Sequence, residues 1–113
     1  MPYSIYVIEL KKKVFTENWK FRAANPQFKG SLQCLYVGMT SKTPKERFEQ
    51  HINGGKSKKG VKISAWIVEK YGNYLRPSLY NEIPILKTKA AALEKEKEVA
   101  LALRRQGYAV WFN

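Results

Sequence analysis

Five side chains spread along the chain have the types that cut phosphodiester bonds. Tyr6 and Tyr36 lie in two strand-like segments, and Arg47 and His51 are four residues apart in a helix-like one. A hydroxyl or an imidazole can position or deprotonate water, and a guanidinium can neutralise a phosphate. Glu96, in a later helical segment, offers a carboxylate to a divalent metal. Together these residues predict phosphoryl transfer.

The two tyrosines need neighbouring strands to bring them together. Residues 3–10 alternate in the manner of a strand. The two faces of this strand would carry Tyr6, Ile8 and Leu10 on one side and Ile5 and Val7 on the other. Residues 32–39 predict a second strand, most simply antiparallel to the first, so Tyr6 and Tyr36 would lie near each other.

The segment that carries Arg47 and His51 has a well-marked helix start. Residues 43–46 read Thr-Pro-Lys-Glu, which is a capping box with proline at the first helical position. Phe48 and Ile52 are four residues apart and would pack on the sheet. Arg47 and His51 have the same spacing, so we expect them on a neighbouring stripe at the rim of that contact.

The remaining segments complete an α+β pattern. Residues 11–31 are polar and basic but contain Trp19, Phe21 and Phe28, which predicts an ordered insertion loop. The other predicted elements are a helix at 64–71 ended by Gly72, an edge or bent strand at 74–86 interrupted by Pro77 and Pro84, a helix at 89–106 capped by Thr88 and ended by Gly107, and a final extended segment at 108–113.

A helical wheel of residues 89–106 singles out one glutamate. The apolar stripe consists of Ala92, Leu93, Val99, Ala100 and Leu103. Of the glutamates nearby, only Glu96 falls within this stripe, whereas Glu94 and Glu98 point elsewhere. A carboxylate directed at a sheet is costly unless a metal or a cationic partner compensates it. Glu96 is therefore the predicted metal ligand, with Glu94 in reserve.

The composition favours a polyanion as the partner. The 113 residues suggest one domain, and 21 Lys and Arg against 9 Asp and Glu give a net charge of +12. No apolar run is long enough to cross a membrane, and the N-terminus lacks the pattern of a signal peptide. The single cysteine, Cys34, permits no internal disulfide. We therefore expect a cytoplasmic protein that binds nucleic acid and not membranes.

In their order and spacing these residues resemble the GIY-YIG endonuclease family over nearly the whole chain. Ser4-Ile5-Tyr6 is similar to the first half of the family signature, with Ser for Gly, and Tyr36-Val37-Gly38 is similar to the second half. The resemblance implies an α+β fold in which a small, mainly antiparallel three-stranded sheet is flanked by three helices. It also implies a Mg²⁺ or Mn²⁺ cofactor and a catalytic set of Tyr6, Tyr36, Arg47, His51, Glu96 and Asn113. Tyr6, Tyr36 and His51 remain alternatives for the general base.

The expected function is metal-dependent cleavage of DNA, with branched or damaged DNA as the implied substrate and RNA as an alternative. The lysines expected to contact phosphates are Lys11, Lys12, Lys13, Lys42, Lys45, Lys56, Lys58, Lys59 and Lys62. Specificity would come from the insertion at 11–31, from a homodimer or from a separate targeting protein. The rival expectation is a non-catalytic module that keeps the fold and binds nucleic acid or acts as an adaptor.

Overall fold

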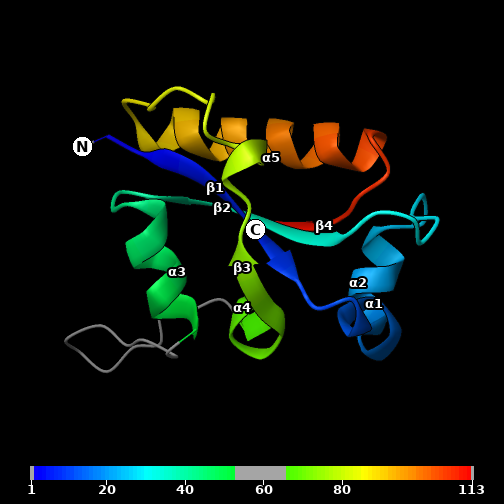
Figure 1. Ribbon diagram of the computed structural model, residues 1–113. Coiled ribbons are helices and arrows are strands. Elements are labelled where there is room, and N and C mark those ends of the chain that lie inside the picture. Colours follow the sequence, from blue (N-terminus) through cyan, green and yellow to red (C-terminus); the bar gives the residue numbers. More distant parts are fainter. Residues whose placement is uncertain (1, 53–65, 113) are drawn as a thin grey trace.

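A mixed four-stranded sheet forms the centre of the protein (Figure 1). The computed structural model describes residues 2–52 and 66–112. The strands are β1 (Ser4–Leu10), β2 (Cys34–Thr40), β3 (Gly72–Leu75) and β4 (Ala109–Phe112), in the order β3-β1-β2-β4. β1 pairs antiparallel with both β2 and β3, whereas β4 runs parallel to β2. The predicted antiparallel pairing of the first two strands is therefore confirmed.

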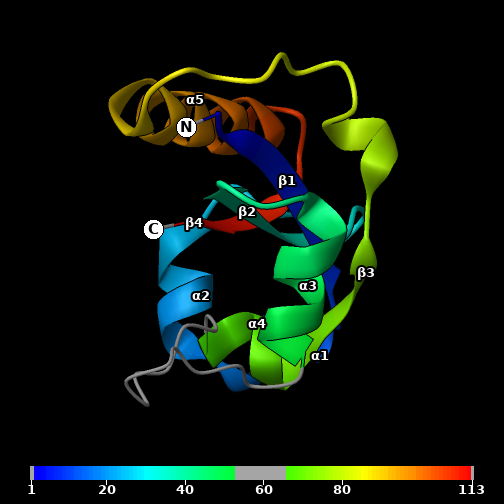
Figure 2. The same ribbon diagram turned by 90° about the vertical axis from the view of Figure 1, so that its left-hand side faces the viewer.

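Helices cover both faces of this sheet. α5 (Lys89–Arg105) lies along one face, and the other side carries α1 (Lys13–Glu17), α2 (Trp19–Ala24), α3 (Pro44–Ile52) and α4 (Trp66–Tyr71), as Figures 1 and 2 show. The predicted α+β class is confirmed. The expected three strands and three helices are wrong, because the described residues form four strands, one of them parallel, and five α-helices. Among the described helices, none has the length and apolar character needed to cross a bilayer.

Alternation along β1 divides its apolar residues between the two faces. Tyr6, Ile8 and Leu10 lie in a core cluster shared with residues of α1, α2 and α4. Ile5 and Val7 lie in the cluster beneath α5. The predicted division of the first strand is confirmed. Because both faces are covered, β1 carries apolar or aromatic residues at nearly every position.

Local hydrogen bonds fix the starts of two helices. At α3, the Thr43 hydroxyl accepts from the Glu46 amide at 3.2 Å, and the Glu46 carboxylate accepts from the Thr43 amide at 3.4 Å, which confirms the capping box. At α5, the Thr88 hydroxyl accepts from the Ala91 amide at 3.1 Å. Gly107, with a φ of +107°, ends the turn from α5 into β4. These ends position the two helices that carry candidate site residues.

Three predicted segments differ from the structure. Residues 74–86 do not form one strand: β3 ends at Leu75, and Pro77, which has no backbone N–H to donate, begins the short 3₁₀ helix η1 (Pro77–Leu79). The segment predicted as extended at 108–113 contains β4, which joins the sheet and pairs in parallel with β2. The chain reaches β4 directly after crossing the sheet as α5. The insertion at 11–31 is not loop alone, since it contains α1 and α2.

Another segment meets β1 beyond the end of β3. Tyr3 and Leu86 form an isolated antiparallel bridge, in which the two N–H to O=C distances are 2.7 and 2.8 Å. On the side of β3, Glu9 of β1 forms an ion pair with Arg76 at 2.7 Å. Both sides of β1 are therefore occupied along most of its length.

Candidate active site

Two strands and one helix bring three ring side chains together. Tyr6 on β1, Tyr36 on β2 and His51 on α3 meet on the side of the sheet opposite α5. The Tyr6 hydroxyl oxygen lies 2.8 Å from His51 Nε2, in a buried hydrogen bond. The ring centre of Tyr36 lies 6.2 Å from that of Tyr6 and 5.8 Å from that of His51. Three of the predicted site residues thus form one cluster, which we call the ring cluster.

Burial determines the charge of the ring cluster. Tyr6, Tyr36 and His51 are 1%, 2% and 0% exposed. Burial raises the pKa of Tyr6 above its ordinary value of 10, with Tyr36 adding to the rise and the nearby Arg47 guanidinium opposing it. Burial, aided by the charge of Arg47, lowers the pKa of His51 from 6.5 to about 4. Tyr6 and His51 are therefore both neutral at pH 7.

Gly38 makes room for the Tyr6 hydroxyl. It pairs with Tyr6 across β1 and β2, and a Cβ atom at this position would lie 2.5 Å from the Tyr6 oxygen and 3.0 Å from Tyr36 Cε2. A larger residue would push the Tyr6 ring away from His51. The glycine that follows Tyr36 and Val37 thus has a packing reason within this structure.

Arg47 lies between the ring cluster and the surface. Its guanidinium donates to Gln50 Oε1 at 3.1 Å and lies near the Tyr6 hydroxyl. A pocket of about 400 Å³ opens beside it, lined by Tyr3, Met39, Thr40, Ser41, Lys42, Arg47, Gln50 and Lys89. This lining contains three cations and no carboxylate, so it suits a phosphate. We call it the Arg47 pocket.

The buried side of α3 differs from the prediction. His51, expected at the rim, is fully buried, and Ile52, expected to pack on the sheet, is 41% exposed. Phe48 packs against the core on the side of the ring cluster, as expected. The physical reason is the bond to Tyr6, because a buried phenol needs a polar partner and His51 supplies it.

Glu96 points inward on the opposite side of the sheet. It is 2% exposed, whereas Glu94 and Glu98 are exposed, so the predicted direction of Glu96 is confirmed. Lys89, which lines the Arg47 pocket, precedes Glu96 by two helical turns, or about 10 Å along the axis of α5. The start of α5 therefore reaches the Arg47 pocket, but Glu96 does not line it, so the structure does not bring Glu96 together with the ring cluster.

The side chains near Glu96 limit the metal that it could hold. Among the described residues, Glu96 is the one buried carboxylate, and no group of three or more His, Cys, Asp or Glu side chains could enclose an ion. Mg²⁺ keeps several waters and binds through one or two carboxylates, whereas zinc needs three or four protein ligands. A single carboxylate fits Mg²⁺ or Mn²⁺ and not a structural zinc ion.

The predicted basic residues that the structure describes lie in two separate places. Lys42 lines the Arg47 pocket, and Lys45 is exposed in the first turn of α3. The exposed lysines at 11–13 follow the far end of β1, about 25 Å from Tyr3 by the rise of a strand. The predicted site residues that lie outside the described part of the chain are Lys56, Lys58, Lys59, Lys62 and Asn113.

Six residues of the Arg47 pocket were not predicted, and Gln50, Tyr3 and Lys89 are the most informative of them. Gln50 holds the Arg47 guanidinium, and their i,i+3 spacing on a helix could have suggested this bond. Tyr3 and Lys89 come from segments far apart in the sequence. Only the fold brings these two residues to the same pocket, so no local pattern could have identified them.

The chain was also compared with known proteins. Comparison with protein-family models, with curated proteins and with solved structures finds no match. The resemblance to the GIY-YIG family therefore rests on the residues named above, and the function has to be argued from the site itself.

Proposed function

We propose that this protein is a metal-dependent endonuclease of the GIY-YIG type that hydrolyses phosphodiester bonds in nucleic acid, with DNA as the expected substrate. The observation that carries the proposal is the 2.8 Å bond between Tyr6 and His51 next to Arg47 and its cationic pocket. A pair that can exchange a proton thus lies beside a group that can bind a phosphate. A core histidine that only satisfied a buried tyrosine would need no such pocket.

Arg47 would bind the scissile phosphate. The hydrogen bond that Arg47 donates to Gln50 orients its guanidinium, whose planar fork matches two phosphate oxygens. Negative charge on those oxygens develops during the reaction, so a fixed cation stabilises the transition state more than the ground state. Lys42 and Lys89, on the wall of the same pocket, would hold the adjoining phosphates.

Tyr6 and His51 would take the proton from the attacking water. A Tyr6 phenolate is disfavoured at pH 7 because burial raises the pKa of the hydroxyl. His51 is neutral, and in the tautomer with its proton on Nδ1, Nε2 accepts the Tyr6 hydrogen. The Tyr6 oxygen can then receive a proton from water as it passes its own to His51, so no free phenolate has to form. Tyr36 packs against both rings and orients the pair.

Glu96 would hold the metal. Mg²⁺ or Mn²⁺, when bound, supplies positive charge for the scissile phosphate and the leaving oxygen. Because Glu96 is 2% exposed, its carboxylate would have to open toward solvent to hold a Mg²⁺ that keeps several of its waters. Glu96 lies on α5 two turns after Lys89 of the Arg47 pocket, so a metal held by it would have to approach the phosphate from the α5 side of the sheet.

The first test removes the Tyr6 hydroxyl. Tyr6→Phe deletes the oxygen bonded to His51, and Tyr71→Phe is the matched control, because Tyr71 is equally buried and its hydroxyl donates to Glu17 at 3.0 Å. Cleavage of end-labelled single-stranded, duplex and branched DNA is measured with Mg²⁺. We expect Tyr6→Phe to cut about 100-fold more slowly, and Tyr71→Phe to stay within about threefold of wild type. Equal rates for the two variants would contradict the role of Tyr6.

The second test concerns the metal ligand. Glu96→Gln keeps the shape of the side chain and removes its charge, and Glu94→Gln makes the same change at an exposed position two residues away. We expect cleavage to be lost in Glu96→Gln and in wild type with EDTA, and to persist in Glu94→Gln. Cleavage by Glu96→Gln at the wild-type rate would remove Glu96 from the site.

One observation favours a second candidate, a non-catalytic nucleic-acid-binding or adaptor module. The ring cluster is at most 2% exposed, so water reaches Tyr6 only if Arg47 or a neighbour moves. In a binding module the cluster would be core, and Arg47→Ala would change affinity alone. Wild-type protein that binds every DNA substrate and cuts none would favour this account.

A further inference from the structure

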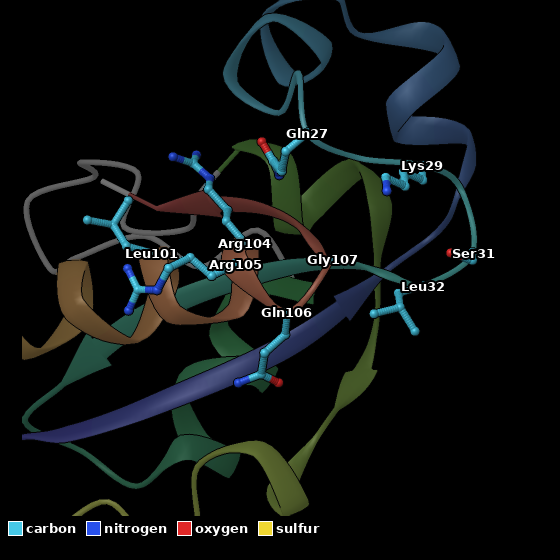
Figure 3. Close-up of a pocket in the computed structure, with 9 residues that line it drawn as sticks. All are labelled: Gln27, Lys29, Ser31, Leu32, Leu101, Arg104, Arg105, Gln106 and Gly107. Carbon is cyan, nitrogen blue, oxygen red and sulfur yellow. The ribbon is translucent and has the colours of Figure 1, made fainter.

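A second pocket lies at the other end of α5, outside the candidate active site (Figure 3). It has a volume of about 610 Å³ and is lined by Gln27, Lys29, Ser31, Leu32, Leu101, Arg104, Arg105, Gln106 and Gly107. This lining carries three cations, several amide and hydroxyl groups and no carboxylate. We call it the Arg105 pocket. Its charge suits an anion, and its leucines give it an apolar floor.

One cation of the Arg105 pocket is held in a fixed orientation. The side-chain oxygen of Asn25, a residue 1% exposed, accepts from Arg104 Nε at 3.2 Å and from the Val110 amide at 2.7 Å. Arg104 Nη2 also donates to the Val110 carbonyl at 2.8 Å. These bonds use two of the five guanidinium N–H donors, and the other three bond to none of the described residues. A preorganised guanidinium binds an anion with little loss of conformational freedom.

The insertion at 11–31 supplies the facing wall of this pocket. Figure 3 shows Gln27 and Lys29 on the loop that faces Arg104 on α5. Lys12 donates to the Gly30 carbonyl at 2.7 Å, which ties this loop to the end of β1. The insertion, one of three sources of specificity expected from the sequence, thus builds one side of a cationic pocket.

The negative end of the α5 helix dipole does not prevent an anion from binding in the Arg105 pocket. Carbonyl groups at a helix end carry partial negative charge. Here the carbonyls of Leu103 and Arg104 accept from the backbone amides of residues 106–108 at 3.0 to 3.1 Å, so these carbonyls are satisfied. The full positive charges of Arg104 and Arg105 outweigh the partial negative charge that remains at the end of the helix.

The length of α5 sets the distance between the two pockets. Its first residue, Lys89, lines the Arg47 pocket, and its last, Arg105, lines the Arg105 pocket. Its 17 residues span about 25 Å. A strand of duplex advances about 3.4 Å per nucleotide, so a ligand that fills both pockets extends over about seven nucleotides.

We propose that the Arg105 pocket binds a backbone phosphate about seven nucleotides from the scissile bond and thereby selects extended nucleic acid over short fragments. The inference rests on the proposed action on nucleic acid, but it concerns binding and not chemistry. In this inference Lys29 and Arg105 bind substrate and take no part in the reaction itself. It also gives the insertion a part in substrate choice.

The test compares two lengths of DNA hairpin. Fluorescence anisotropy measures the affinity of hairpins with stems of about 4 and about 12 base pairs, which extend for about 14 and 40 Å. The pocket variant is Lys29→Gln with Arg105→Gln, both exposed positions. The control is Lys70→Gln with Lys97→Gln, which removes the same charge at exposed positions outside both pockets.

For the pocket variant we expect about tenfold weaker binding of the long hairpin, less than about threefold weaker binding of the short one, and a salt slope reduced by about 1 to 2. The control variant should lose less than about threefold on both. Equal losses for pocket and control variants would overturn the inference, as would equal losses on both hairpins. Displacement of the long hairpin by a free mononucleotide at low concentration would also overturn it. Because this experiment measures binding, it can support the role of the Arg105 pocket even if cleavage is never observed. Likewise, a negative result for the pocket would leave the nuclease proposal unaffected.

Discussion

The two cationic pockets at the ends of α5 differ in what lies behind their cations. Behind Arg47 lie two buried phenols and an imidazole, which can exchange protons. Behind Arg104 lies Asn25, whose amide can hold a guanidinium but has no proton to exchange near neutral pH. The charge of both pockets suits a phosphate, and only the first has groups beside it that could exchange a proton. In the proposed function, positive charge therefore does not identify the reactive end, whereas the titratable groups beside the charge do.

The largest expected effect would come from removing the cation at the reactive end. Arg47→Ala should lower the cleavage rate by about 1,000-fold or more, because charge that develops on the phosphate loses its partner. Affinity should change by less than about fivefold, since Lys42 and Lys89 remain. Lys97→Ala, which removes a cation at an exposed position outside both pockets, is the control and should cut at the wild-type rate. A rate for Arg47→Ala close to that of wild type would break the comparison between the two pockets.

The second largest expected effect is the loss of folding stability in acid, which comes from His51 in the ring cluster. His51 has a pKa of about 4 when folded and 6.5 when exposed, so between these values the unfolded chain binds more protons. The stability that neutral His51 provides is complete above pH 6.5 and is lost as pH falls toward 4. We expect this to lower the free energy of unfolding by up to about 3 kcal/mol. Urea titrations of wild type and His51→Gln between pH 7 and pH 4 would measure it, and equal pH dependence in both would contradict it.

Gly38→Ala should lower stability by about 2 kcal/mol, because its new methyl group would overlap the Tyr6 oxygen. The effect should be smaller in a Tyr6→Leu background, where both atoms nearest to the new methyl group, Tyr6 Oη and Cζ, are gone, so the two changes should not be additive. Thermal unfolding of the four proteins in this cycle would measure the coupling. Strict additivity would show that Gly38 and Tyr6 do not share their space as described.

The smallest expected effects concern the stability of the Arg105 pocket. Arg104→Gln loses the bonds to Asn25 and Val110 and should cost about 1 to 2 kcal/mol. Arg105→Gln, at an exposed position, should change stability by less than about 0.5 kcal/mol. Urea midpoints of the two variants would distinguish the orienting arginine from the exposed one. Equal losses would mean that Arg104 is not held as the hydrogen bonds indicate.

Local patterns predicted the elements of this fold better than their assembly. The capping box at 43–46 and the alternation in β1 are short-range features, and both are confirmed. The parallel pairing of β4 with β2 depends on α5 folding back over the sheet, which no local sequence pattern specifies. The helices of the insertion did have a signal that was missed, because Asn18 caps α2 by accepting from the Phe21 amide at 3.0 Å.

The candidate site shows the same limit. The helical spacing of Arg47 and His51 was correct, but the rotation of α3 about its axis was not, since Tyr6 draws His51 inward and leaves Ile52 exposed. A wheel ranks residues by hydrophobicity and cannot include a hydrogen bond to another element. Lys89 joins the Arg47 pocket only through tertiary structure. Sequence proposed the candidate groups of the ring cluster, and the fold brought further charged residues to the pocket beside them.

The bridge between Tyr3 and Leu86 has a consequence for self-association. Exposed strand edges offer unpaired N–H and C=O groups to other copies of a chain and so promote aggregation. Here β3 is only four residues long and is followed by Pro77, and the edge of β1 beyond it is closed by backbone bonds to Leu86. This side of the sheet therefore has few backbone groups for a second molecule to pair with. We expect it to resist intermolecular strand addition even at the high local concentrations that form when a basic protein gathers on nucleic acid.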